Sequence, residues 1–306
     1  MSLKIVFMGT PEFSVPTLEA LINNKFEVLT IYTQPPKKSK RGQKINISPV
    51  QKFSEKNNLP VRNPENLSND EQYNFIKNLS ADLAVVVAYG KLIPTNILKT
   101  TRLGFVNIHA SLLPKWRGAA PIQRAIMNGD KKTGVSIMKI EDKLDSGPVL
   151  ASKELVFGQS ATYGEIQKKL SLMGSNLLIE SLKNIENGKA KFIDQIHSDS
   201  TYAKKIDKNE TKINWSLDAN KVIAHIHGLS PNPGAWFEHE NERFKVLRTN
   251  KSTASGNPGT LLDENLTIAC KSVSIQILEI QRQGKNKQTA KDFLLGKKIN
   301  KGSILT

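Results

Sequence analysis

The sequence predicts an α/β protein in which a doubly wound parallel sheet is followed by a small β-barrel. Apolar, β-prone segments alternate with helical patterns over the first two thirds of the chain, whereas short strands separated by turn residues fill the last third. The length of 306 residues also exceeds that of a usual single domain. We therefore expect two domains, residues 1–206 and 207–306.

The first domain opens with a βαβ pattern. Residues 3–9 read as a buried strand that ends at a glycine, and residues 27–33 read as a second strand. Between them, residues 16–23 read as a helix, with Ser14 available as its cap and Pro16 near its first turn. A strand, a helix and a strand in so short a stretch are typical of a parallel sheet.

Further strands are expected at four places, residues 81–89, 105–109, 133–140 and 148–156. The apolar run Val85–Val87 is typical of a strand that is covered on both faces. The first strand is not followed by the Gly-x-Gly-x-x-Gly pattern that cradles pyrophosphate, so we discount an NAD-dependent dehydrogenase.

The second domain is expected to be a small barrel. A polar linker over residues 203–211 and an amphipathic helix over residues 219–227 come first. Short strands follow at residues 235–238, 243–249, 259–263, 266–270 and 273–281. Strands of this length and spacing, separated by glycine and asparagine turns, indicate a barrel.

Composition limits the class of protein. The net charge of +16 suits a polyanionic partner, although a lysine-rich solvated surface explains it equally well. The single cysteine, Cys270, excludes an internal disulfide, and no histidine or cysteine cluster predicts a metal. No secretory signal is visible, and no apolar run approaches the ~20 residues of a membrane helix. We expect a cytoplasmic protein, and nothing in the sequence requires more than a monomer.

The segment 34–44 contains five basic residues and no acidic one, and its proline and glycine disfavour regular structure. One interpretation is a solvated loop. The other is a basic arm that becomes ordered on RNA phosphates.

The end of the strand at residues 105–109 carries Asn107 and His109. Because strand residues two apart face the same way, the amide and the imidazole should converge. An amide can hold a developing oxyanion, and an imidazole can move a proton near neutral pH. On spacing alone, a structural histidine held by hydrogen bonds is the more common outcome.

The wider pattern resembles the folate-dependent formyltransferase family. The motifs are Asn107 to Pro114 and Leu144 to Pro148, with Phe7 to Phe13 and Ile213 to Ser216 in support. The resemblance covers about residues 3–298. It implies a Rossmann-like catalytic domain and an OB-like, tRNA-binding barrel. It also implies formyl transfer from 10-formyltetrahydrofolate to the α-amine of methionyl-initiator tRNA for translation initiation, without a metal.

The resemblance also implies residue roles. Asn107 would hold the oxyanion, His109 would add charge and pass a proton, and Asp145 would orient His109, although Asp-Ser-Gly is equally a turn signal. The folate pocket would be lined by Ser111, Leu112, Leu113 and Pro114, with Ala88, Tyr89 and Gly90. The tRNA would be engaged by Lys37, Lys38, Lys40, Arg41 and Lys44, with Arg41 foremost.

Three further positions receive weaker expectations. Trp116 and Arg117 are expected to face the acceptor end of the tRNA by stacking and charge, with core packing as the alternative for Trp116. His227 stands where the family often has arginine, which weakens any role of that position in gripping phosphate.

Two other functions compete. A formyltransferase could act on a small amine, such as glycinamide ribonucleotide or an amino sugar, and an inactive RNA-binding module would need no catalysis. The basic segment favours tRNA over a small amine. The joint presence of Asn107, His109 and Asp145 argues against an inactive module.

The basic segment leads to a prediction about salt. If phosphate contacts dominate, affinity for tRNA should fall steeply between about 50 and 200 mM salt, by a factor of ~10³ for some six contacts. Filter binding across that range measures it. A flat dependence would contradict the basic-arm interpretation.

Overall fold

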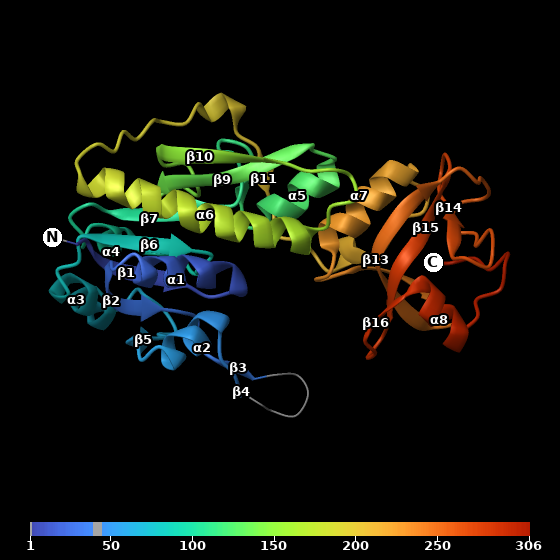
Figure 1. Ribbon diagram of the computed structural model, residues 1–306, viewed down its shortest axis with the longest axis horizontal. Helices are drawn as coiled ribbons and strands as arrows, with labels where there is room; N and C mark the ends of the chain where they lie inside the picture. The colour runs from blue at the N-terminus through green and yellow to red at the C-terminus, as the bar shows by residue number, and fades with distance from the viewer. Residues whose placement is uncertain (1, 39–44) are drawn as a thin grey trace. The chain divides into compact units, whose positions relative to one another are not determined.

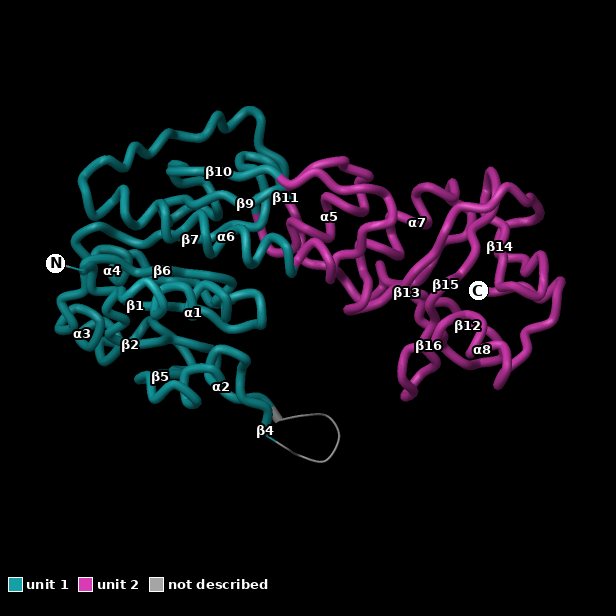
Figure 2. Tube along the Cα trace, in the orientation of Figure 1, with its two compact units in different colours: residues 1–117, 134–154, 168–202 teal, residues 118–133, 155–167, 203–306 magenta. Residues whose placement is uncertain are grey.

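The computed structural model describes residues 2–38 and 45–306 and divides into two compact units. The first unit consists of residues 1–117, 134–154 and 168–202. The second consists of residues 118–133, 155–167 and 203–306 (Figure 2). Two stretches from the first two thirds of the chain, residues 118–133 and 155–167, thus pack within the second unit. The domain boundary at residue 206 stays a prediction.

A seven-stranded sheet forms the centre of the first unit (Figure 1). Its strands are β1 (Lys4–Gly9), β2 (Glu27–Tyr32), β5 (Val61–Arg62), β6 (Leu83–Val87), β7 (Phe105–His109), β9 (Lys132–Lys139) and β10 (Val149–Val156). They lie in the order β10-β9-β7-β6-β1-β2-β5. The neighbours from β7 to β5 pair in parallel, and β9 pairs with β7 in antiparallel fashion. The predicted α/β class is confirmed.

The strand order reverses at β1. From β1 the chain builds outward through β2 on one side, and it then returns to place β6 and β7 on the other. In such sheets the carboxyl ends of the strands on either side of the reversal border a crevice where ligands bind. The motif Asn107 to Pro114 begins at the carboxyl end of β7 and therefore lies near this position.

Helices and short turns accompany the sheet. They are η1 (Glu12–Ser14), α1 (Val15–Asn23), α2 (Pro49–Lys56), α3 (Asp70–Asn78), α4 (Thr95–Leu98), α6 (Tyr163–Glu186) and η2 (His197–Asp199). The sequence starts α2 and α3 with side-chain caps: Ser48 accepts from the Gln51 N–H and Asn69 from the Gln72 N–H. Ser14 occupies the cap position of α1, but its hydroxyl donates to the Val87 carbonyl instead.

The two faces of the sheet are both covered. On one face, Ile76 of α3 and Ile97 of α4 pack with Met8, Val86 and Phe105 in a fully apolar cluster. On the other, α6 approaches β7 so closely that a Cβ at Gly174 would lie 2.8 Å from Ile108 Cγ2. This double coverage explains why β6 is buried at every position.

The second unit contains a five-stranded antiparallel sheet. Its strands are β12 (Ala235–His239), β13 (Glu242–Ser252), β14 (Thr267–Ala269), β15 (Ser274–Arg282) and β16 (Lys287–Thr289). Its helices are α5 (Pro121–Asn128), η3 (Asn209–Thr211), α7 (Ala219–Leu229) and α8 (Ala290–Gly296). The Phe237 and Phe244 rings stack with centroids 5.3 Å apart, and Phe293 meets Phe244 edge-on at 5.8 Å.

Residues 302–306 close this sheet into a ring. Thr306 exchanges backbone hydrogen bonds with Glu238 of β12, and Ile304 bridges Thr260. The neighbouring Leu261 bridges Ile268 of β14, which pairs with β15 and so leads back through β13 to β12. The predicted barrel is therefore confirmed, although the expected strand at residues 259–263 is reduced to isolated bridges.

Two other segments differ from expectation. The basic segment is not wholly irregular, because β3 (Lys37–Lys38) pairs with β4 (Ile45–Asn46). The expected linker at residues 203–211 begins in β11 (Tyr202–Ala203), which pairs with β8 (Arg117–Gly118). Separately, none of the helices in the described residues is long and apolar enough to traverse a membrane.

His227 is a fully buried histidine whose hydrogen bonds fix one neutral form. Its Nδ1–H donates to the Gln159 carbonyl at 2.9 Å, and its Nε2 accepts from the Thr249 N–H at 3.1 Å. Burial lowers the pKa of His227 below its ordinary value, and the nearby Arg248 acts in the same direction. The side chain thus joins α7, β13 and residue 159 rather than gripping phosphate.

This geometry predicts acid sensitivity. Because the folded pKa lies below the unfolded value of ~6.5, the unfolded chain binds the extra proton first. The contribution of His227 to the free energy of unfolding is therefore fully present above about pH 6.5. It decreases as the pH falls from there toward the folded pKa, by at most ~1.4 kcal/mol per pH unit for each such group. Denaturant unfolding between pH 7.5 and 5 measures the slope.

The matched variant is His227→Gln, which removes the titrating group. Its unfolding free energy should be lower near neutral pH, by about 1–3 kcal/mol because a buried hydrogen bond is lost. Its acid slope should be shallower than that of the unmodified protein. His225 is half-buried, and desolvation lowers its pKa as well, so His225→Gln should remove a separate part of the acid slope. Equal slopes in all three proteins would contradict the assignment.

Candidate active site

The carboxyl ends of β1 and β6 are fastened together by side chains that follow the first strand. The Thr10 hydroxyl donates to the Tyr89 carbonyl at 2.9 Å, and the Ser14 hydroxyl donates to the Val87 carbonyl at 2.6 Å. Because β6 and β7 are parallel neighbours, with Val86 opposite Asn107, the segments that leave both strands emerge at one edge. The site predicted from the sequence lies along this edge.

Asn107 and His109 lie on β7 as the alternation predicted. Both share the sheet face of Phe105, whereas Ile108 turns to α6. The Asn107 side chain is half-buried and makes no hydrogen bond with any of the residues that the structure describes. Its amide is therefore available to a ligand as a donor.

His109 lies between two hydrogen-bond acceptors. Its Nε2 is 2.9 Å from the Trp116 carbonyl oxygen, and its Nδ1 is 3.6 Å from Asp145 Oδ2. The histidine is buried, and the Asp145 side chain is only 16% exposed, which shields the pair from solvent. A carbonyl only accepts, so Nε2 carries a proton, and a second proton on Nδ1 would face a carboxylate.

Both partners of His109 have unusual backbone conformations. Trp116 has φ +60° and Asp145 has φ +47°, in the left-handed region that side chains other than glycine rarely adopt. Such residues persist only where surrounding contacts hold them. The structure thus brings Asp145 to His109 across 36 residues of sequence by a tightly specified turn.

The segment Ser111 to Pro114 is attached to β9. The Ser136 hydroxyl donates to the Ser111 carbonyl at 2.8 Å and accepts from the Leu113 N–H at 3.2 Å. Leu112 packs over Gly134, where a Cβ would lie 2.5 Å from its Cδ2. Ser111 itself is buried and its hydroxyl donates to the Lys115 carbonyl. What this segment can offer a ligand is therefore backbone and apolar surface.

The segment Ala88 to Gly90 alternates between solvent and core. Ala88 and Gly90 are exposed, whereas the Tyr89 side chain is 1% exposed within the apolar cluster. Burial raises the pKa of Tyr89 to about 12. Any contribution of Tyr89 to ligand binding must come from its backbone, whose carbonyl already accepts from Thr10 and Gln34.

Exposed leucines flank these segments. Leu92, two residues after Gly90, is 87% exposed, and Leu144, directly before Asp145, is 66% exposed. Large apolar side chains displayed beside backbone donors and acceptors are a suitable lining for a flat, partly apolar ligand such as a pterin. The residues present therefore fit a folate.

Only part of the basic segment can be placed. Lys37 is exposed, and the Lys38 backbone pairs with Ile45 in the small β3–β4 hairpin. Lys40, Arg41 and Lys44 lie outside the described residues.

The expectation for Arg117 was wrong. Its side chain is buried, and its guanidinium donates to Gln195 Oε1 from Nε at 3.1 Å and from Nη2 at 2.7 Å. Nη2 also lies 3.0 Å from His197 Nδ1. Arg117 is therefore a buried structural cation and does not face a nucleic acid. Gln195 gave no sequence signal, because its partners lie 48 to 78 residues away.

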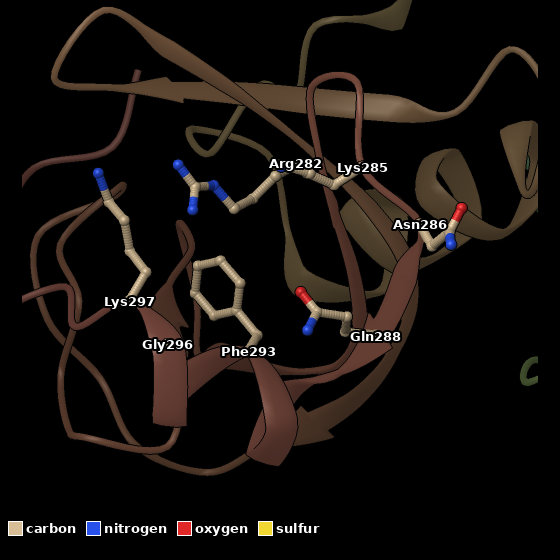
Figure 3. A pocket seen from close by; sticks show the side chains of 7 residues that line it. All are labelled: Arg282, Lys285, Asn286, Gln288, Phe293, Gly296 and Lys297. Carbon is tan, nitrogen blue, oxygen red and sulfur yellow. The ribbon is translucent and has the colours of Figure 1, made fainter.

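A separate cavity of about 330 Å³ lies in the second unit (Figure 3). Arg282 and Lys297 line it, but both already pair with Glu242, at 2.7 and 3.3 Å. None of the predicted catalytic residues reaches it. Elsewhere, the described part of the chain contains no cluster of three or more His, Cys, Asp or Glu side chains that could hold a metal.

Comparison with known proteins identifies the class to which this fold and site belong. The formyl transferase profile matches residues 3–182, and the profile of the formyl transferase C-terminal domain matches residues 205–298. The chain belongs to the formyl transferase family. The crystal structure of HypX from Aquifex aeolicus in complex with tetrahydrofolic acid shares the fold, with a TM-score of 0.67 at 16% identity over 99% of this chain and 51% of that chain.

Sequence relatives narrow the class. A methionyl-tRNA formyltransferase of Pelagibacter ubique is 48% identical over 308 residues, which cover 100% of this chain and 99% of the relative. One of Chelativorans sp. is 47% identical over 311 residues and 100% of both chains. Within the formyl transferases, the chain falls among the methionyl-tRNA formyltransferases.

The packing under Leu112 leads to a prediction for Gly134→Ala. The added Cβ would lie 2.3 Å from the Lys153 carbonyl oxygen, which is backbone and cannot turn away. The free energy of unfolding should fall by about 1–3 kcal/mol, as for other overpacked sites. Denaturant titration measures it.

Gly158→Ala is the matched control, because a Cβ there meets nothing within 4 Å. It should leave the free energy of unfolding within ~0.5 kcal/mol of that of the unmodified protein. Equal effects of the two substitutions would show that the close contact at Gly134 is unimportant.

Proposed function

We propose that Asn107, His109 and Asp145 carry out the formyl transfer from 10-formyltetrahydrofolate to the α-amine of methionyl-initiator tRNA. The observation that supports this most is the position of His109, with a carbonyl at one nitrogen and the Asp145 carboxylate at the other, two residues from the available amide of Asn107. Full-length similarity to methionyl-tRNA formyltransferases favours this acceptor over glycinamide ribonucleotide or an amino sugar.

The chemistry is acyl transfer between two nitrogens. A neutral amine forms a bond to the formyl carbon, the bond from that carbon to the donor nitrogen breaks, and one proton passes from the amine to the departing nitrogen. The oxygen of the formyl group carries negative charge in between. Placing the amine and holding that charge are the two tasks of the protein.

The residues divide these tasks. Asn107 donates its amide N–H to the oxygen where the charge develops, and the His109 imidazolium adds an opposite charge in a shielded setting. Asp145 keeps that ring in orientation, with its carboxylate 3.6 Å from Nδ1. It also relays the amine proton, through water, toward the departing donor nitrogen.

The folate donor supplies the formyl group. Ser111, Leu112, Leu113 and Pro114 would hold it by backbone groups and apolar contacts, together with the segment from Ala88 to Gly90. The exposed Leu92 and Leu144 support this placement, because they offer apolar area two residues after Gly90 and directly before Asp145.

The tRNA is assigned to two basic regions. The first is the segment with Lys37, Lys38, Lys40, Arg41 and Lys44, whose exposed Lys37 is the best-defined member. The second is the barrel within residues 207–306, where Lys285 is exposed on the turn between β15 and β16 and Lys287 is exposed at the start of β16. We assign the protein to the cytoplasm, where translation initiates, and we propose that it acts as a monomer.

The first experiment is transfer of labelled formyl from 10-formyltetrahydrofolate to initiator methionyl-tRNA, with free methionine and glycinamide ribonucleotide as parallel acceptors. Labelling of the charged tRNA alone is the expected result. Transfer to a small amine instead would leave the catalytic trio intact and overturn the tRNA assignment of the basic segment and the barrel.

Substitutions test the residue roles. Asn107→Ala should lower kcat by about 10²–10³, since an oxyanion donor is lost. His109→Ala and Asp145→Asn should lower kcat by about 10²–10⁴. The Kd for the tRNA should change less than about threefold, because these groups act in the transition state. Normal turnover by Asn107→Ala would rule out the oxyanion role.

A further inference from the structure

The segment from Gln195 to Thr201 forms hydrogen bonds with Asp145 and Trp116, the two residues that face the His109 ring. At its start, the Gln195 side chain is buried, and its Nε2 donates to the Asp145 carbonyl at 2.9 Å and to the Gly147 carbonyl at 2.7 Å. These two carbonyls border the turn in which Asp145 has a left-handed backbone. One carboxamide thus fixes the turn that presents the Asp145 carboxylate.

The end of the segment holds the other partner. Thr201 Oγ1 accepts from the Trp116 N–H at 2.9 Å, and the Thr201 carbonyl accepts from the Arg117 N–H at 2.8 Å. These bonds surround the Trp116 peptide unit whose carbonyl lies 2.9 Å from His109 Nε2. Trp116 also has a left-handed backbone, so it needs such support.

Arg117 bonds to both ends of the segment from Gln195 to Thr201. Its guanidinium gives two hydrogen bonds to Gln195 Oε1, while its backbone N–H goes to Thr201. Within the described residues, no carboxylate lies within ion-pair distance of this buried cation. A guanidinium that bonds to an amide oxygen polarises the amide and strengthens its N–H donors, here those directed at Asp145 and Gly147.

We propose that Arg117, Gln195 and Thr201 form a clamp that positions His109 for formyl transfer by fixing Asp145 and Trp116. None of the three touches His109, so they are positioning residues. The inference rests on the proposed roles of His109 and Asp145, and it assigns a function to the segment between α6 and β11.

The first test is Gln195→Ala in the full-length protein, assayed with 10-formyltetrahydrofolate and initiator methionyl-tRNA. Displacement of a catalytic group by about 1 Å lowers turnover by ~10²-fold, so kcat should fall between 10- and 100-fold. KM for both substrates should change less than about threefold, because the clamp binds neither of them. A kcat within threefold of that of the unmodified protein would overturn the proposal.

A double-mutant cycle with Asp145→Ala separates positioning from general damage. If Gln195 acts through Asp145, the double variant should lose no more turnover than Asp145→Ala alone. A merely structural role would instead multiply the two losses. Multiplied losses would therefore also overturn the proposal.

Thr201 provides a conservative pair should Gln195→Ala fold poorly. Thr201→Ser keeps the hydroxyl that accepts from Trp116 and should retain most of kcat. Thr201→Val keeps the shape without the acceptor and should lose about tenfold. The matched control is Ser198→Ala in the same segment, which should behave normally. Among the described residues, its exposed hydroxyl bonds to Asp199 alone, at 3.1 Å. Equal activity of the serine and valine variants would remove Thr201 from the clamp.

The outcomes also distinguish the clamp from the function itself. An unmodified protein that transfers no formyl, or a fully active Asp145→Ala, would refute the proposed mechanism. An unmodified protein that works and an Asp145→Ala that fails, next to a normal Gln195→Ala, would refute the clamp alone.

Discussion

The site depends on one constraint, the alignment of parallel strands whose carboxyl ends meet at a single edge. β1, β6 and β7 satisfy it, and the hydroxyls of Thr10 and Ser14 fasten the first of these ends to the second. Everything that acts on a ligand leaves the sheet there. The segments after β6 and β7 need no structure of their own, because their starting points are set by the ladder of backbone hydrogen bonds beneath them.

On this rigid edge the protein places a less regular layer. The turn with Asp145 and the peptide of Trp116 have strained backbones, and each presents an acceptor to the same imidazole. The strain is held by hydrogen bonds to Gln195 and Thr201 rather than by the sheet. Regular structure thus fixes where His109 is, and irregular structure fixes what it faces.

The sequence predicted what local periodicity encodes. Alternation along β7 correctly put Asn107 and His109 on one face, and apolar patterns located the main strands to within a few residues. Asp145 could be joined to them only by family resemblance, because no local rule spans 36 residues. Arg117 was misjudged for the same reason: a basic residue beside Trp116 suggests a nucleic-acid contact, and its neutral partner Gln195 lies 78 residues further on.

The ring of the second unit includes residues 302–306, through the bonds of Thr306 to Glu238 and of Ile304 to Thr260. These residues belong to the ring of paired strands and do not form a tail. Without them, β12 and the stretch at Thr260 would each present unpaired backbone groups, and such sheet edges recruit strands from other molecules. A peptide fused directly after Thr306 would therefore start inside the ring of paired strands, beside the hydrogen bonds that Thr306 exchanges with Glu238, and would have to leave the ring without breaking them.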